Sequence, residues 1–113
     1  MKVIIAGSRT IKDARLVEDA IRLSGFHITE VVCGCADGVD KLGEAWAIYN
    51  QIPVVRYPAP WAQHGKAAGP IRNAQMAEYA DALVCVWDGV SRGSRSMIRL
   101  ARKAGLKVFE VVV

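Results

Sequence analysis

The chain has 113 residues, 52% of them hydrophobic and 23% charged, and its 15 basic residues against 11 acidic ones give a net charge of +4. This length predicts a single domain over residues 1–113 with one hydrophobic core, and the apolar fraction excludes disorder and collagen-like repeats. No apolar run approaches the roughly 20 residues that cross a bilayer, and the first residues enter a strand pattern directly. We therefore expect a cytoplasmic protein with no membrane partner.

The first half of the chain alternates between strand and helix patterns. Short apolar runs end at Gly7 and Gly34, whereas the segments between them carry apolar residues at helical spacing. Gly25 is placed to end the first of these helices. In chain order, the predicted elements are a strand at 2–6, a helix at 13–24, a strand at 30–33, a helix at 39–50 and a strand at 53–57.

The second half continues the alternation after a connection over residues 58–69, which is rich in proline and glycine and has no strong periodicity. Pro70 suits the first turn of a helix, because its missing N–H would have no partner there. The predicted elements are a helix at 70–79, a strand at 82–87, a helix at 94–104 and a strand at 107–112.

Strands that are apolar on consecutive residues and alternate with helices are typical of a parallel sheet covered on both faces. The pattern predicts an α/β fold, a Rossmann-like three-layer sandwich with a five-stranded parallel sheet. The order of the strands within the sheet does not follow from the pattern.

Glycines and basic residues gather in the loops that follow the first four strands. The glycines are Gly7, Gly34, Gly38, Gly65, Gly69, Gly89 and Gly93, and the basic residues are Arg9, Lys66, Arg72, Arg92 and Arg95. Ligands of open parallel sheets bind at this edge. Glycine allows close approach of a ligand to the backbone, and a helix N-terminus favours an anion. Together these features predict a pocket for one phosphorylated small molecule.

Four segments in these loops match, in order and spacing, the pattern of a known family. They are Gly7-Ser8-Arg9, Gly34-x-Ala36-x-Gly38-Val39-Asp40, Gly69-Pro70-x-Arg72-Asn73-x-x-Met76 and Trp87-Asp88-Gly89-x-Ser91-Arg92-Gly93. Over essentially its whole length the chain resembles the YspA/YpsA-related branch of the SLOG superfamily, which includes the Lonely-Guy phosphoribohydrolases and the DNA-processing protein DprA. The resemblance implies a Rossmann-like domain that binds nucleotides or their derivatives.

Two departures from the family pattern bear on function. Members of this branch usually read Gly-Gly-Ala-Arg-Gly-Val-Asp, whereas Cys35 replaces the second glycine here and Asp37 replaces the arginine. Lonely-Guy enzymes release the base with an arginine, which Arg72 matches, and a glutamate, whose place Met97 takes. A thioether cannot serve as a general base, so whether the chain is an enzyme stays open.

The leading hypothesis is a sensor or regulatory module for a mononucleotide or an ADP-ribose-like molecule, with no cofactor and no metal. The expected roles are a backbone cradle from Gly7, Gly34, Gly38, Gly93 and Ser94, phosphate contacts from Arg9, Arg72 and Arg92, a ribose hydroxyl on Asp40 or Asp88, and further hydrogen bonds from Ser8, Asn73 and Ser91. Trp61 either stacks on a base or pins its loop to the body.

Two other functions remain open. The first is a nucleotide N-glycosidase that uses Arg72, with Asp88 as the replacement carboxylate and Asp40 or Glu44 as further candidates. The second is DprA-like binding of single-stranded nucleic acid, which is the least favoured because the chain lacks aromatics interleaved with basic residues over an extended surface. The apolar surplus for this size is compatible with a homodimer.

Overall fold

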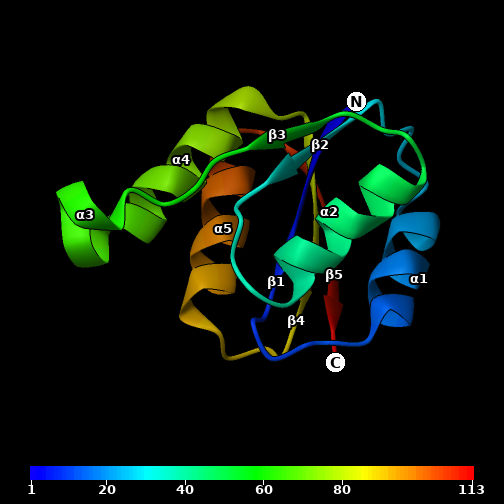
Figure 1. Ribbon diagram of the computed structural model, residues 1–113, viewed down its shortest axis with the longest axis horizontal. Coiled ribbons are helices and arrows are strands. Elements are labelled where there is room, and N and C mark those ends of the chain that lie inside the picture. The colour runs from blue at the N-terminus through cyan, green and yellow to red at the C-terminus, as the bar shows by residue number, and fades with distance from the viewer.

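The computed structural model describes residues 1–113 and confirms the predicted α/β, Rossmann-like three-layer fold (Figure 1). The sheet is parallel throughout, in the order β3-β2-β1-β4-β5. Its strands are β1 (Lys2–Gly7), β2 (Glu30–Cys33), β3 (Val54–Arg56), β4 (Ala82–Trp87) and β5 (Lys107–Val112). The helices are α1 (Ala14–Ser24), α2 (Val39–Tyr49), α3 (Trp61–His64), α4 (Ala68–Tyr79) and α5 (Arg92–Lys103), with a 3-10 turn, η1 (Gly65–Ala67), between α3 and α4. None of the helices combines the length and the apolar character that a bilayer crossing needs.

Two helical layers bury the two faces of the sheet, with α1 and α2 on one face and α4 and α5 on the other. Successive side chains of a strand point to opposite faces, so β1 sends Val3 and Ile5 to the α1–α2 side and Ile4 and Ala6 to the α4–α5 side. All four are buried. The consecutive apolar runs in the sequence therefore reflect strands that are covered twice.

Local backbone signals place the ends of the helices on the first face. The Asp13 carboxylate caps α1 by accepting the backbone N–H of Arg15 at 2.9 Å, and Gly25 ends it with a φ of 69°. Gly38 precedes α2 with a φ of 74°, and a Cβ there would lie 2.3 Å from the carbonyl oxygen of Ser8. Glycine is required at this turn because the loop after β1 passes directly against it.

The connection over residues 58–69 differs from the prediction, since it contains α3 and η1. The carbonyl oxygen of Pro60 accepts the backbone N–H groups of both Gln63 and His64 at 3.1 Å. This short helix buries no side chain. Because helical periodicity in a sequence reports a buried face, α3 leaves no apolar pattern by which it could be found.

Helices α4 and α5 begin at Ala68 and Arg92, slightly earlier than predicted. For α5 the reason is the cap: the Ser91 hydroxyl accepts the backbone N–H of Ser94, so the first turn already lies before residue 94. The start of this helix therefore reaches the sheet edge at which a ligand is expected.

The strand order places the direction change of the chain at β1. From β1 the chain moves outward to β2 and β3, and it then returns to β4 on the other side of β1. Gly7 and Val86 pair at the carboxyl end of the two central strands. In sheets of this type the crevice at this point is where ligands bind.

Candidate functional site

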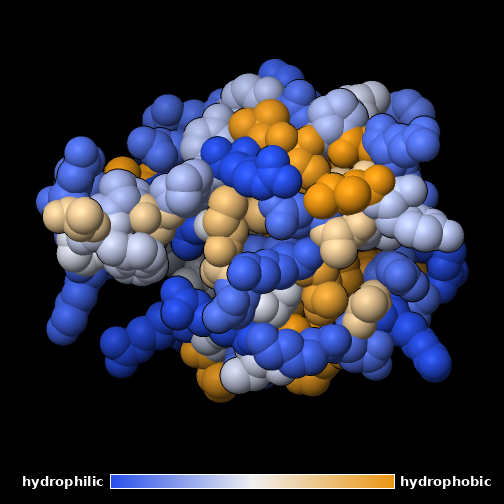
Figure 2. Space-filling view, viewed as in Figure 1, coloured by the Kyte–Doolittle hydropathy of each residue, from blue (hydrophilic) through white to orange (hydrophobic).

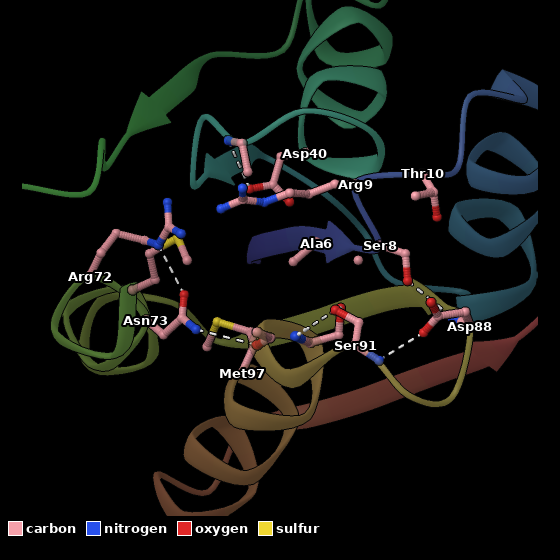
Figure 3. Close-up of a pocket in the computed structure, with 15 residues that line it drawn as sticks. Ala6, Ser8, Arg9, Thr10, Asp40, Arg72, Asn73, Asp88, Ser91 and Met97 are labelled. Carbon is pink, nitrogen blue, oxygen red and sulfur yellow. Dashed lines mark hydrogen bonds between the residues drawn. The ribbon is translucent and has the colours of Figure 1, made fainter. Parts of the chain in front are cut away.

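A cleft of about 330 Å³ opens at the carboxyl ends of β1 and β4 (Figure 3). Loops after β1, β2 and β4 and one side of α4 form its walls. Most of the predicted site residues line it, namely Gly7, Ser8, Arg9, Asp40, Arg72, Asn73, Asp88, Ser91, Gly93 and Ser94. The structure thus brings together residues that are up to 87 positions apart, between Gly7 and Ser94.

The loop after β1 is fixed by Ser8, which is buried. Its hydroxyl oxygen accepts the backbone N–H of Asp88 at 3.0 Å, and its carbonyl oxygen accepts the backbone N–H of Val39 at 3.3 Å. Gly7, just before it, has no space for a side chain, because a Cβ would lie 1.8 Å from the carbonyl oxygen of Val86. Ser8 therefore joins the β1 loop to the β4 loop and to the start of α2.

Hydrogen bonds within the β4 loop fix the N-terminus of α5. One carboxylate oxygen of Asp88, Oδ1, accepts the backbone N–H groups of Val90 at 2.9 Å and Ser91 at 2.8 Å, and these bonds lower the pKa of Asp88. The Ser91 hydroxyl in turn accepts the Ser94 hydroxyl at 3.2 Å. Asp88 is consequently an ionised turn former, and a carboxylate held in this way is poorly suited to donate a proton.

Asp40 has the opposite environment, although it lines the same cleft. Its side chain is 5% exposed, and this burial raises its pKa to about 6, against the backbone N–H of Ala36 and the positive charge of Arg72, which both oppose the shift. The Ala36 N–H donates to Asp40 Oδ2 at 3.3 Å. A carboxyl group with a pKa of about 6 can exchange protons near neutral pH.

Arg72 reaches the cleft from α4 and is held by the protein itself. Its Nε donates to Asn73 Oδ1 at 2.9 Å, and its Nη1 donates to the carbonyl oxygens of Gly34 and, at 3.4 Å, Tyr57. The guanidinium is therefore oriented before any ligand arrives. Arg9 is exposed and extends across the cleft from the β1 loop toward the side on which Arg72 lies (Figure 3).

Other residues expected at the site lie elsewhere. Gly38 shapes the turn before α2 and does not line the cleft, while Gly34 lines a smaller pocket beside it. Arg92 is exposed on α5 and contributes to neither pocket. Arg95 donates from Nη2 to the Gly89 carbonyl oxygen at 3.3 Å on the outer side of α5.

The charge of the cleft is consequently balanced. Of the five basic residues expected at this edge of the sheet, only Arg9 and Arg72 line the cleft. The carboxylates of Asp40 and Asp88 line the same cleft. The cleft therefore carries no net positive charge from its side chains, and the N-terminus of α5 adds the partial positive charge of its unpaired N–H groups.

Family membership follows from comparison with known proteins. Residues 1–64 match the family described as YspA, cpYpsA-related SLOG. The chain belongs to this SLOG family. It is also similar to the Gene 61 protein of Mycobacterium phage D29, with 36% identity over 118 residues that cover 95% of this chain and 93% of that protein.

The fold of this SLOG protein also resembles a solved structure, DNA processing protein A (DprA) from Streptococcus pneumoniae. The TM-score is 0.76 at 22% sequence identity, and the match covers 96% of this chain and 49% of that one. The SLOG protein thus spans about half the length of DprA, and the likeness concerns the fold.

The structure locates the departures of this SLOG protein from the family pattern. Cys35 adopts a φ of 64° at a position where the pattern has glycine. Asp37 does not line the cleft, and it forms an exposed ion pair with Lys41 at 3.6 Å. Met97, in place of the Lonely-Guy glutamate, is buried and lines the cleft, so a carboxylate is missing there.

Sequence reasoning did not assign Thr10, Ala36 or Met76 to the site of the SLOG protein, yet all three line the cleft. Thr10 continues the β1 loop beyond Arg9. Met76 lies four residues after Arg72 on α4, and this helical spacing would have placed it beside Arg72 in the cleft. The buried thiols offer no alternative chemistry, because burial raises the pKa of Cys33 and of Cys85 to about 12. No group of three potential metal ligands occurs in the structure.

Proposed function

We propose that the protein binds a nucleotide or nucleotide derivative, a mononucleotide or an ADP-ribose-like molecule, in this cleft and acts as a sensor or regulatory module. The observation that carries the proposal is Gly93 in the first turn of α5. A Cβ at Gly93 would meet no atom within 4 Å, and its φ is not positive. Neither packing nor backbone conformation therefore calls for glycine at this position.

Glycine is less favourable than alanine in a helix, by up to about 1 kcal/mol in the helix interior, so its presence in the first turn needs another reason. Gly93 lines the cleft, between the cap residue Ser91 and the buried Ser94. Because Gly93 has no side chain, the backbone N–H groups of Arg92 and Gly93 stay accessible to an anionic group, whereas the N–H of Ser94 donates to the Ser91 hydroxyl. A phosphate bound beside Gly93 would explain why this position has no side chain.

The balanced charge of the cleft favours a ligand that carries hydroxyl groups as well as phosphate. Asp40 and Asp88 can accept hydrogen bonds from ribose hydroxyls, while Arg9 and Arg72 can donate to phosphate oxygens. A bare polyanion or a nucleic-acid backbone would meet the two carboxylates unfavourably. A nucleotide satisfies both kinds of group.

Isothermal titration calorimetry tests this proposal directly. The protein is titrated with the four common 5′-mononucleotides and with ADP-ribose at near-physiological salt. We expect at least one of them to bind with a submillimolar dissociation constant, and Ser91→Ala to weaken that binding. Ser96→Ala serves as the matched control, since Ser96 lies on the same helix outside the cleft. Absence of binding by every compound contradicts the proposal.

Hydrolysis of the N-glycosidic bond is the second candidate function. The place of Asp40 in the cleft, together with its raised pKa, favours this function. This carboxyl group lines the cleft with a pKa of about 6, whereas Asp88 is held ionised by its turn. In such a reaction the bond from C1′ to the base breaks, Asp40 gives its proton to the leaving base, and water adds to C1′ and returns a proton to Asp40.

Release of free base from a mononucleotide, followed by chromatography, tests this second function. We expect Asp40→Asn to abolish release, whereas Asp37→Asn, a change to an exposed carboxylate outside the cleft, leaves it unchanged. If the wild-type protein leaves the nucleotide intact after prolonged incubation at high protein concentration, binding without chemistry is the function.

A further inference from the structure

A second, smaller pocket of about 160 Å³ adjoins the cleft. The two pockets share Arg9, Ala36 and Arg72, so a single ligand can occupy both. The remaining wall of the smaller pocket comes from the β2 loop and from the segment that leads into α3, and it includes Cys35, Pro58, Ala59 and Trp61.

Trp61 is the one tryptophan of the chain that packs into neither half of the core. Trp46 packs against the core on the α1–α2 side of the sheet, and Trp87 belongs to the core on the α4–α5 side. Trp61 is instead 52% exposed, on a short helix that stands out from the body of the molecule (Figures 1 and 2). Because Trp61 lines the smaller pocket and is only half buried, its aromatic surface is available to a ligand.

The two pockets differ in chemistry along the length that a ligand would span. The main cleft presents hydroxyl groups, carboxylates and helix N–H groups, whereas the smaller pocket presents an indole ring, a proline and alanines. The two arginines lie at the junction. A molecule that fits both pockets has a polar, phosphorylated part for the main cleft, joined to a flat, weakly polar ring for the smaller pocket.

We propose that the smaller pocket is the base subsite and that Trp61 is the platform on which the base stacks. This inference rests on the proposed nucleotide-binding function and adds the orientation of the ligand: phosphate at the N-terminus of α5, base against Trp61, and Arg9 and Arg72 beside the sugar–phosphate between them. The ring joins no core cluster, and its edge lies beside Gly69 at the start of α4, so its packing against the body of the protein is limited.

Stacking of the base on Trp61 predicts little selectivity among the four bases. Every base has a π face, so stacking on an aromatic side chain depends little on base identity. We therefore expect the affinities of the four mononucleotides to differ by only a few-fold, and each to exceed clearly the affinity of ribose 5-phosphate, which lacks the ring.

The test compares Trp61→Leu and Trp61→Phe with the wild-type protein, by calorimetry with adenosine 5′-monophosphate and ribose 5-phosphate. Loss of base stacking weakens binding by about tenfold or more, so we expect that loss for adenosine 5′-monophosphate in Trp61→Leu and near wild-type affinity in Trp61→Phe. The affinity for ribose 5-phosphate should not change. Tyr49→Ala, which removes an exposed aromatic ring outside both pockets, is the matched control.

The outcomes of this experiment distinguish the base subsite at Trp61 from nucleotide binding itself. If the wild-type protein binds the nucleotide and Trp61→Leu binds it equally well, the base subsite is wrong and nucleotide binding stands. Equal weakening by leucine and phenylalanine also overturns the stacking role. If the wild-type protein binds neither compound and no other nucleotide, the proposed function fails and the base subsite fails with it.

Discussion

Asp40 and Arg72, the two charged residues that the fold buries, meet against the same glycine. A Cβ on Gly34 would lie 2.6 Å from Asp40 Oδ2 and 2.8 Å from Arg72 Nη1. The Arg72 guanidinium donates to the Gly34 carbonyl oxygen, so the backbone of the β2 loop holds this buried cation close to Asp40. Burial has the largest influence on the pKa of Asp40 and raises it, and the opposing positive charge of Arg72 does not offset that effect.

Gly34→Ala should destabilise the protein, because the new methyl group must displace one of two buried charged side chains. Overpacking of this kind costs typically about 1–3 kcal/mol in the free energy of unfolding. Urea denaturation measures it. Gly69→Ala is the control, since a Cβ there makes an ordinary contact at 3.6 Å with Trp61. Equal stability of Gly34→Ala and wild type would show that the loop relaxes freely.

Asp40 should make the protein less stable as the pH rises from about 4 to above 6. Its pKa is about 6 in the folded protein and 3.8 in the unfolded chain. Between these values the folded state binds more protons, so the free energy of unfolding falls with rising pH. A shift of this size corresponds to roughly 2–3 kcal/mol.

The comparison that isolates Asp40 is the wild-type protein against Asp40→Asn in urea denaturation at several pH values. Other carboxyl groups titrate in both proteins and cancel. We expect the difference, wild type minus variant, to decrease from pH 4 to pH 7. A difference that is constant or increases over this range would contradict the raised pKa.

Gly93→Ala should separate stability from binding. Alanine fits without contact and favours the helix, so the free energy of unfolding should rise by up to about 1 kcal/mol. The methyl group enters the space assigned to phosphate, so nucleotide affinity should fall severalfold in calorimetry. Ser96→Ala, on the same helix outside the cleft, should leave affinity unchanged. Unchanged affinity in Gly93→Ala would place the phosphate elsewhere.

Ser8→Ala should weaken both stability and binding, because the backbone N–H of Asp88 loses its acceptor between the β1 and β4 loops. Leaving such a group without a partner costs about 1–3 kcal/mol. Ser24→Ala is the matched control: Ser24 also accepts a backbone N–H, from Phe26 at 3.2 Å, but at the end of α1 and outside the cleft. It should lower stability alone. Normal nucleotide affinity in Ser8→Ala would show that this tie does not shape the site.

The sequence predicted the parts of the site that follow from topology. Once a parallel sheet is recognised, residues just after its strands must share one edge, and Ser8 and Asp88 do so. It did not predict the direction in which Arg92 and Arg95 point, because that depends on how α5 rotates as it packs on the sheet. The burial of Asp40 likewise depends on residues far away in the sequence, Gly7 and Arg72 among them, and no local pattern records this proximity.

Nucleotide binding in the cleft can be tested by an amide NMR titration of the isotope-labelled protein with adenosine 5′-monophosphate. We expect the largest chemical-shift changes at the backbone amides of Ser8, Arg9, Gly93 and Ser94 and at the indole N–H of Trp61. Changes confined to the outer side of α5, around Arg99 and Arg102, or no change at millimolar concentrations of any of the four mononucleotides or of ADP-ribose, would contradict nucleotide binding in the cleft.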